Sequence, residues 1–191
     1  MFLINGFKNL LQPQYAGDFI YILVTFILLW KITKEDLQEN IISNNNIIFG
    51  LIFGVITIAW LPQLKPVILN QSFIDLTSLP FIRIIDSFFA ALFLGILFLA
   101  IQLIPKVRLG SGDIKLAILT GVLLGFYWSF IALIAVSILL ALYSIIMILN
   151  KGKNQAYSEV YPLAPFWLLG SIFAVIFGNI ISGYLGIVLI K

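Results

Sequence analysis

The sequence predicts an all-α, polytopic integral membrane protein, a bundle of about six transmembrane helices in one domain over residues 1–191. Hydrophobic residues make up 62% of the chain and charged residues only 10%, whereas soluble domains carry about 25% charged residues. Apolar runs approaching the roughly 20 residues that cross a bilayer recur along the chain, and short polar segments separate them. The lipid bilayer is therefore an expected partner.

The expected spans, in chain order, are 16–32, 47–62, 84–104, two spans within 116–149, and 163–190. The first helix is expected to continue toward Asp36, and residues 43–46 supply polar side chains that can cap the second. Residues 63–83 read as a polar loop with prolines, and Pro105 ends the third helix. The last span is expected to be tilted, or broken near Gly178.

The segment 116–149 contains no charged side chain. One helix of that length would reach about 51 Å at 1.5 Å per residue, which exceeds a hydrocarbon core of about 30 Å. We therefore place a turn near Gly125, where a glycine precedes the aromatic residues Phe126-Tyr127-Trp128. With the N-terminus outside, this split places seven Lys and Arg residues in the cytoplasm and four outside. Without the split the count is six against five, so the positive-inside rule favours the split.

The composition also limits the chemistry. The chain has no cysteine and no histidine, which excludes thiol and Ser-His catalysis, disulfides and zinc sites built on those residues. We expect no cofactor and no metal. No basic stretch interleaved with aromatic residues indicates a nucleic-acid partner. Carboxylates, hydroxyls, cations and the backbone remain as catalytic groups.

Asp113 stands in the polar run Gly110-Ser111-Gly112-Asp113-Ile114-Lys115, between two long apolar segments. An ionisable group at the edge of hydrocarbon is a functional hypothesis by default, and glycines allow another segment to approach closely. The alternative is that Asp113 caps a helix that starts at Ile114.

Asp36 lies two helices away from Asp113 under either span count, so both carboxylates are expected on one face of the membrane. Its alternative role is that of a solvated charge in a loop with Lys34, Glu35 and Glu39. Asp18 and Asp86 are expected to cap the outer ends of their own helices, and Asp75 and Glu159 to lie in loops. Two adjacent carboxylates share a proton, so one can activate water while the other polarises a carbonyl.

With these residues identified, the chain resembles the type IV prepilin peptidases and archaeal preflagellin peptidases, membrane aspartic proteases of the GxGD kind. The run from Gly110 to Leu116 is similar to their GxGD-x-K-L signature. Asp36-Leu37 followed by Ile42-Ser43-Asn44 looks like their first motif, with Ser43 in place of proline. Tyr161-Pro162-Leu163-Ala164-Pro165-Phe166 is similar to a third landmark, with Ala164 in place of glycine.

The resemblance implies that Asp36 and Asp113 form a catalytic pair at the cytoplasmic face of the cell membrane. The residues expected to support the motifs are Gly110, Ser111, Gly112, Lys115, Asn44 and Pro165. It also implies a prepilin-like precursor as substrate, a pilin, pseudopilin or preflagellin with a short basic leader. Without cysteines, the chain looks like a minimal form that lacks the cysteine-containing cytoplasmic domain of larger members.

Two alternatives stay open at this point. The first is a non-enzymatic small membrane protein, a transporter or channel component, with the Asp residues on an ion path; coupling sites of that kind usually lie near the membrane midplane. The second concerns Glu35, Glu39 and Glu159, which are expected on the side of the proposed site. They either attract the basic leader or are solvated surface charges, and exposed ion pairs contribute only about 0–1 kcal/mol.

Overall fold

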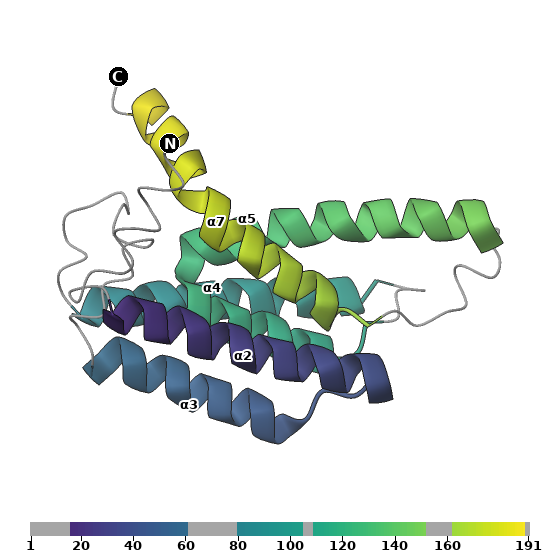
Figure 1. Cartoon of the computed structure of the whole chain (residues 1–191), viewed down its shortest axis with the longest axis horizontal. Coiled ribbons are helices and arrows are strands. Elements are labelled where there is room, and N and C mark those ends of the chain that lie inside the picture. Colours follow the sequence, from purple (N-terminus) through teal and green to yellow (C-terminus); the bar gives the residue numbers. More distant parts are fainter. Residues whose placement is uncertain (1–15, 61–79, 105–108, 152–161, 190–191) are drawn as a thin grey trace.

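The computed structural model describes residues 16–60, 80–104, 109–151 and 162–189, and the ordered elements in these ranges are helices. Figure 1 shows how they are arranged. Their bounds are α2 (Ala16–Glu39), α3 (Asn44–Trp60), α4 (Pro80–Gln102), α5 (Ser111–Lys151) and α7 (Ala164–Leu189). The all-α prediction is confirmed for the described residues. The sequence predictions for Asp75 and Glu159 fall outside them.

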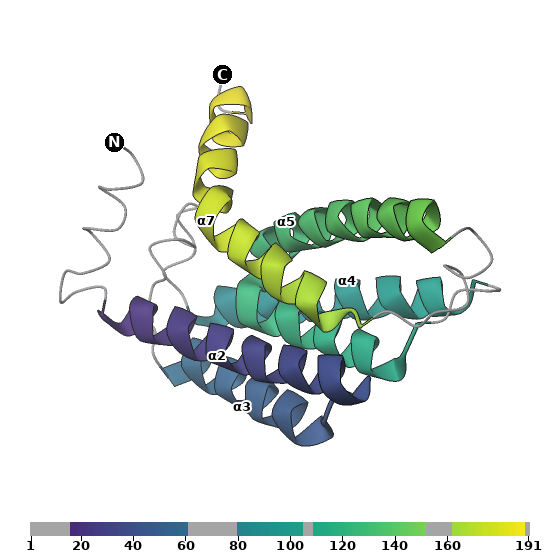
Figure 2. The same cartoon turned by 45° about the vertical axis from the view of Figure 1, so that its right-hand side comes forward.

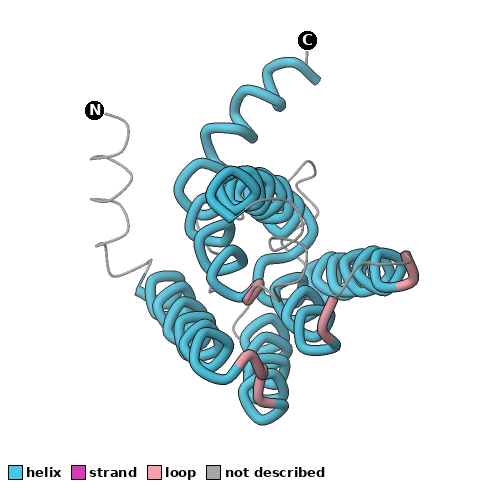
Figure 3. The backbone as a smooth tube through the Cα atoms, turned by 90° about the vertical axis from the view of Figure 1, so that its right-hand side faces the viewer, coloured by secondary structure: helices cyan, strands magenta, loops and turns pink. Residues whose placement is uncertain are grey.

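One end of the bundle collects the segments that the sequence singled out. The last turns of α2 and α4 and the first turns of α3, α5 and α7 lie together, at the right in Figure 1. Figure 3 looks onto this end, where the described loops gather. We call it the motif end. Polar loop residues are thus concentrated where several helix termini leave backbone groups without partners inside their own helices.

The connection between α2 and α3 is shorter than the sequence indicated. Helix α2 continues through Asp36 to Glu39, and Asn40 follows with a left-handed φ of 51°, a conformation that asparagine tolerates after a helix. The Ser43 carbonyl accepts the Ile47 N–H at 3.3 Å, which starts α3. Asp36 is therefore a helix residue, and its position is fixed by the α2 backbone.

Helix α5 changes direction at Gly125, where the sequence predicted the split. Gly125 has φ 72° and ψ 178° within the helix range, and the segments before and after it run in opposite directions (Figures 1 and 2). The Phe126 N–H donates to the Asp86 carboxylate at 3.0 Å. The expectation that Asp86 caps its own helix is therefore wrong: it caps the second half of α5, because the turn brings that first N–H to α4.

Close backbone packing joins the first half of α5 to α4. A Cβ atom added at Gly121 would lie 2.7 Å from the Ala91 nitrogen and 2.8 Å from the Ala90 carbonyl carbon. On α7, the fully buried Trp167 packs against Phe98 of α4, with ring centroids 5.7 Å apart. These contacts leave α5 in the middle of the bundle, between α4, α7 and α3.

Two helix boundaries differ from the sequence prediction. Residues 80–83, expected in a loop, form the first turn of α4, because Pro80 at the first helical position needs no N–H partner. The rest of that expected loop, residues 63–79, lies outside the described residues. Helix α7 is continuous from Ala164 to Leu189 and bends where it leaves the bundle (Figure 2), so no break occurs near Gly178.

Two helical segments of the described chain, Ile84–Gln102 and Ser111–Asn150, are long and apolar enough to cross a membrane. Shorter apolar helices cover Asn44–Thr57 and Ala164–Gly178. Large apolar side chains such as Phe88, Leu149 and Trp30 are exposed on the helix surfaces. These features are typical of a helical membrane protein; the number of six spans stays a prediction.

Candidate active site

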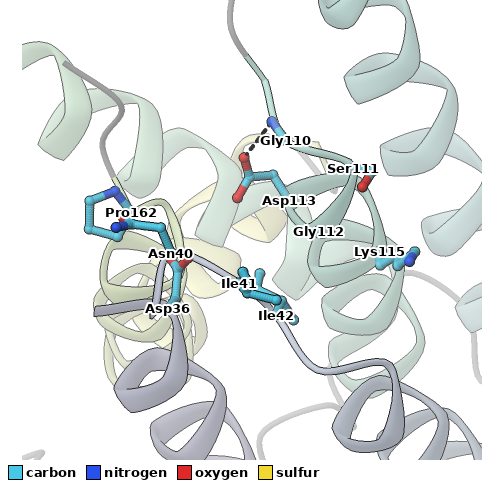
Figure 4. A pocket seen from close by; sticks show the side chains of 10 residues that line it. All are labelled: Asp36, Asn40, Ile41, Ile42, Gly110, Ser111, Gly112, Asp113, Lys115 and Pro162. Carbon is cyan, nitrogen blue, oxygen red and sulfur yellow. Dashed lines mark hydrogen bonds between the residues drawn. The ribbon is translucent and has the colours of Figure 1, made fainter. Parts of the chain in front are cut away.

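A pocket of about 210 Å³ opens at the motif end. It is lined by Asp36, Asn40, Ile41, Ile42, Gly110, Ser111, Gly112, Asp113, Lys115 and Pro162. Figure 4 shows these side chains, with Asp36 and Asn40 on one side and Asp113 on the other. Residues from three distant parts of the sequence therefore meet here, and two of them are the carboxylates that the sequence singled out.

Asp113 lies in the first turn of α5, which begins at Ser111. Its Oδ2 accepts the Gly110 N–H at 3.0 Å, and its own N–H donates to the Gly110 carbonyl at 3.1 Å. The carboxylate thus reaches back to the residue that precedes the helix, as the third-position acid of a capping box does. The alternative that Asp113 caps a helix starting at Ile114 is wrong, because the helix starts three residues earlier.

Gly112 makes room for the α2–α3 connection. A Cβ atom added there would lie 3.2 Å from Cβ and 3.3 Å from Cγ1 of Ile42, and Ile42 is buried. Even a methyl group would therefore push Ile42 away from α5. The glycine brings the segment that follows Asp36 against the turn that carries Asp113.

Asp36 is buried, with 5% of its surface exposed. Its Oδ2 accepts the Ala164 N–H at 3.0 Å, and Ala164 is the first residue of α7. The first N–H groups of a helix have no partner within it and favour negative charge. The alternative of a solvated loop charge is therefore wrong: Asp36 belongs to the buried contact between α2 and α7.

The remaining motif residues have different surroundings. Ser111 is exposed at the pocket rim, and Gly110 supplies the N–H that Asp113 accepts. Lys115 donates to the Asn44 Oδ1 at 2.7 Å, across 71 residues of sequence. Pro165, directly after Ala164, lies in the first turn of α7, where proline loses no intrahelical hydrogen bond.

Burial and proximity set the charge state of the pair. Asp113 precedes the uncharged segment that starts at Leu116, so it belongs to the polar end of α5. Burial raises the pKa of Asp113 to about 6; the Gly110 hydrogen bond opposes this rise, and the negative charge of Asp36 adds to it. Burial also raises the pKa of Asp36, against the lowering effect of the Ala164 and Leu163 N–H groups. One proton shared by the two carboxylates fits this arrangement.

Sequence reasoning did not single out Asn40 or Ile41, and it named Pro162 and Ala164 only as members of the third landmark, without a role at the site. Asn40, Ile41 and Pro162 line the pocket, and Ala164 holds Asp36 through its backbone. Backbone donors carry no side-chain signal, although the position of Ala164 before Pro165 marks a helix start. Within the described residues, no group of three or more acidic residues gathers that could hold a metal ion.

Comparison with known protein families gives a match that covers both carboxylates. A family model described as the type IV leader peptidase family matches residues 23–145, which is more than half of the chain. The matched segment contains Asp36, Asp113 and the turn at Gly125. No curated protein and no solved structure matches the chain.

Proposed function

Because the chain belongs to the type IV leader peptidase family, we propose that it is an aspartic endopeptidase that removes the leader of prepilin-like precursors. The observation that carries this proposal is that Asp36 and Asp113, from α2 and α5, line one pocket. Membership of the family makes the chain a membrane protein of the leader-peptidase kind. The aspartic mechanism, the identity of the pair and the substrate are the proposal.

In the proposed reaction, Asp113 is the protonated partner and Asp36 the ionised one. The raised pKa of Asp113 favours its acid form, whereas the first N–H of α7 supports negative charge on Asp36. Asp36 takes a proton from a water molecule, whose oxygen attacks the scissile carbonyl carbon while Asp113 donates a hydrogen bond to the carbonyl oxygen. The tetrahedral intermediate collapses as the leaving amine receives the proton, and the C–N bond breaks.

We further propose that the chain crosses the membrane six times, through α2, α3, α4, the two halves of α5 and α7. The reversal at Gly125 supports two crossings by α5. The motif end then faces the cytoplasm, because this topology puts most Lys and Arg residues on that side. A basic leader would enter the pocket from the cytoplasm, with the following apolar segment among the helices.

The experiment that tests the proposal is co-expression with a prepilin-like precursor, with detection of the shortened product and its new N-terminal residue. We expect the precursor to be cleaved directly before its apolar segment. We also expect cleavage to be lost when either Asp36 or Asp113 is replaced. The ion-path alternative predicts an uncleaved precursor. It gains no support from the described structure, because both carboxylates lie at the ends of helices and not midway along them.

A further inference from the structure

The two helices that carry the carboxylates share little packing of their own. Helix α2 packs mainly on α7 and α3, whereas α5 packs on α4, α7 and α3. A direct hydrogen bond between α2 and α5 runs from the Tyr21 hydroxyl to the Leu123 carbonyl at 2.6 Å, and it lies several helical turns from the pocket. The separation of the carboxylates must therefore be set by the elements that contact both helices, which are α3 and α7.

The first turn of α3 makes a polar contact with each of these helices. Asn46 donates through Nδ2 to Glu35 Oε1 at 2.6 Å, and Glu35 directly precedes Asp36. Asn44 accepts from Lys115 at 2.7 Å, and Lys115 follows Asp113 by two residues. We call these two hydrogen bonds the α3 bridge.

We propose that the α3 bridge sets the separation between the Asp36 and Asp113 carboxylates, so that its side chains are positioning residues for the reaction. This inference rests on the proposed function. The bridge holds each helix at a residue no more than two positions from its carboxylate. Because a helical turn is rigid, a shift at Glu35 or Lys115 would move the neighbouring carboxylate by a similar distance.

The surroundings of Glu35 argue against a role for this residue as a surface charge that attracts the basic leader. Glu35 Oε2 is buried and accepts no hydrogen bond in the described part of the chain, so the Asn46 amide, which donates to Oε1, is the described side-chain partner of this carboxylate. Glu35 is half-buried, and a carboxylate in such a place that loses its partner costs more free energy than the hydrogen bond itself contributes. Of the expected acidic attractants, Glu39 is exposed and Glu159 lies outside the described residues.

The contact on the Lys115 side directs the ammonium group away from the carboxylates. Lys115 lines the pocket, but Figure 4 shows its side chain pointing away from Asp113. Its ammonium group donates instead to Asn44 on α3. Asp36, Asp113 and Lys115 are the titratable side chains that line the pocket. The cation therefore acts through the position of α5 and not as a direct partner of either carboxylate.

The test compares purified variants on a precursor peptide, with kcat and KM measured separately. Lys115→Met and Asn44→Ala should each lower kcat by about 10- to 100-fold with little change in KM, because misplacement of about 1 Å at a reacting group has effects of that size. Asn44→Asp keeps an acceptor for Lys115 and should restore most of kcat. The matched control is Asn45→Ala, an exposed residue of the same turn that should behave as the wild type.

A second readout reports the separation directly. Because the chain has no cysteine, spin labels on Gln38→Cys and Ser111→Cys can measure the α2–α5 distance. Lys115→Met should broaden or lengthen that distance distribution, and Asn45→Ala should leave it unchanged. Replacing both Glu35 and Asn46 with Leu removes the other half of the bridge without leaving an unpaired carboxylate, and the same broadening is expected.

Unchanged kcat in both Lys115→Met and Asn44→Ala would overturn the inference. So would a loss of kcat with an unchanged distance distribution and no restoration by Asn44→Asp. Neither result touches the proposed function, which fails separately if Asp36→Asn or Asp113→Asn still cleaves the precursor.

Discussion

The Asp36 carboxylate accepts the backbone N–H of Ala164 at 3.0 Å, so a residue near the end of α2 caps the start of α7, 128 positions later. The same helix start is tied a second time to α2, where the Thr33 hydroxyl donates to the Ala164 carbonyl at 3.3 Å. The landmark around Pro165 therefore holds Asp36 through the backbone of Ala164, and it also contributes Pro162 to the pocket lining.

Replacement of either carboxylate with its amide tests the catalytic pair. Asp36→Asn and Asp113→Asn should each abolish precursor cleavage while the protein stays in the membrane at normal level, because Asn accepts the same N–H bonds but exchanges no proton. Product is measured by mass spectrometry after co-expression. Asp86→Asn is the matched control: it can still accept the Phe126 N–H and should process normally. Substantial cleavage by either site variant rules out the pair.

The pH dependence of kcat/KM should reflect the protonation states of Asp113 and Asp36. Asp113 must hold its proton to donate to the carbonyl, and its pKa is raised to about 6. The rate should therefore decline as the pH rises above that value, approaching a tenfold loss per pH unit. It should also decline at the acidic end, where Asp36 becomes protonated. The measurement is initial cleavage rate from pH 4 to 9; a rate that climbs steadily through pH 6–8 would contradict the assignment of Asp113 as the acid.

Neutralising Asp113 should stabilise the fold at high pH. Its raised pKa means that the folded state favours the protonated form, so stability is lost as the pH rises from the ordinary Asp range through about 6. Asp113→Asn cannot ionise and should be more stable than the wild type at pH 8, by no more than about 3 kcal/mol, and equal to it at pH 4. Thermal unfolding in detergent at both pH values measures this. An equal effect at both would point to packing and not to charge.

Added methyl groups should distinguish backbone contacts from side-chain contacts along α4 and α5. Gly121→Ala would place Cβ against the α4 backbone at 2.7–2.8 Å, which cannot yield locally, so a loss of about 1–3 kcal/mol or of folded protein is expected. Gly95→Ala meets the Ile118 side chain at 3.1 Å and should be milder. Unfolding midpoints of the two variants provide the comparison, and equal effects would contradict the α4–α5 geometry.

Cleavage should persist in the presence of chelators and thiol-modifying reagents. The chain contains no cysteine or histidine, and the proposed mechanism uses only carboxylates and water. Activity is measured before and after treatment with a chelator, with added zinc as the reversal step. Loss of turnover that zinc restores would count against a metal-free aspartic mechanism.

Asp113 illustrates which features of the protein could be predicted from the sequence alone. Its place directly after Gly110-Ser111-Gly112 and ahead of an uncharged segment identified it as a candidate, because a charge at the hydrocarbon edge is costly unless it has a function. The same hydrophobic pattern predicted the helices, and the length of 116–149 predicted the turn at Gly125. These features are local: each depends on residue types along a short stretch of chain.

The tertiary structure decided the contacts between distant segments. Asp36 read equally well as a solvated charge, and only its packing against the start of α7 buries it. Asp86 read as the cap of its own helix, but the reversal at Gly125 brings the Phe126 N–H to it. Glu35 read as a free surface charge, although it is bound by Asn46. Partners of this kind lie on other helices, and a single sequence carries no record of which helix ends meet, because that depends on how the apolar faces pack.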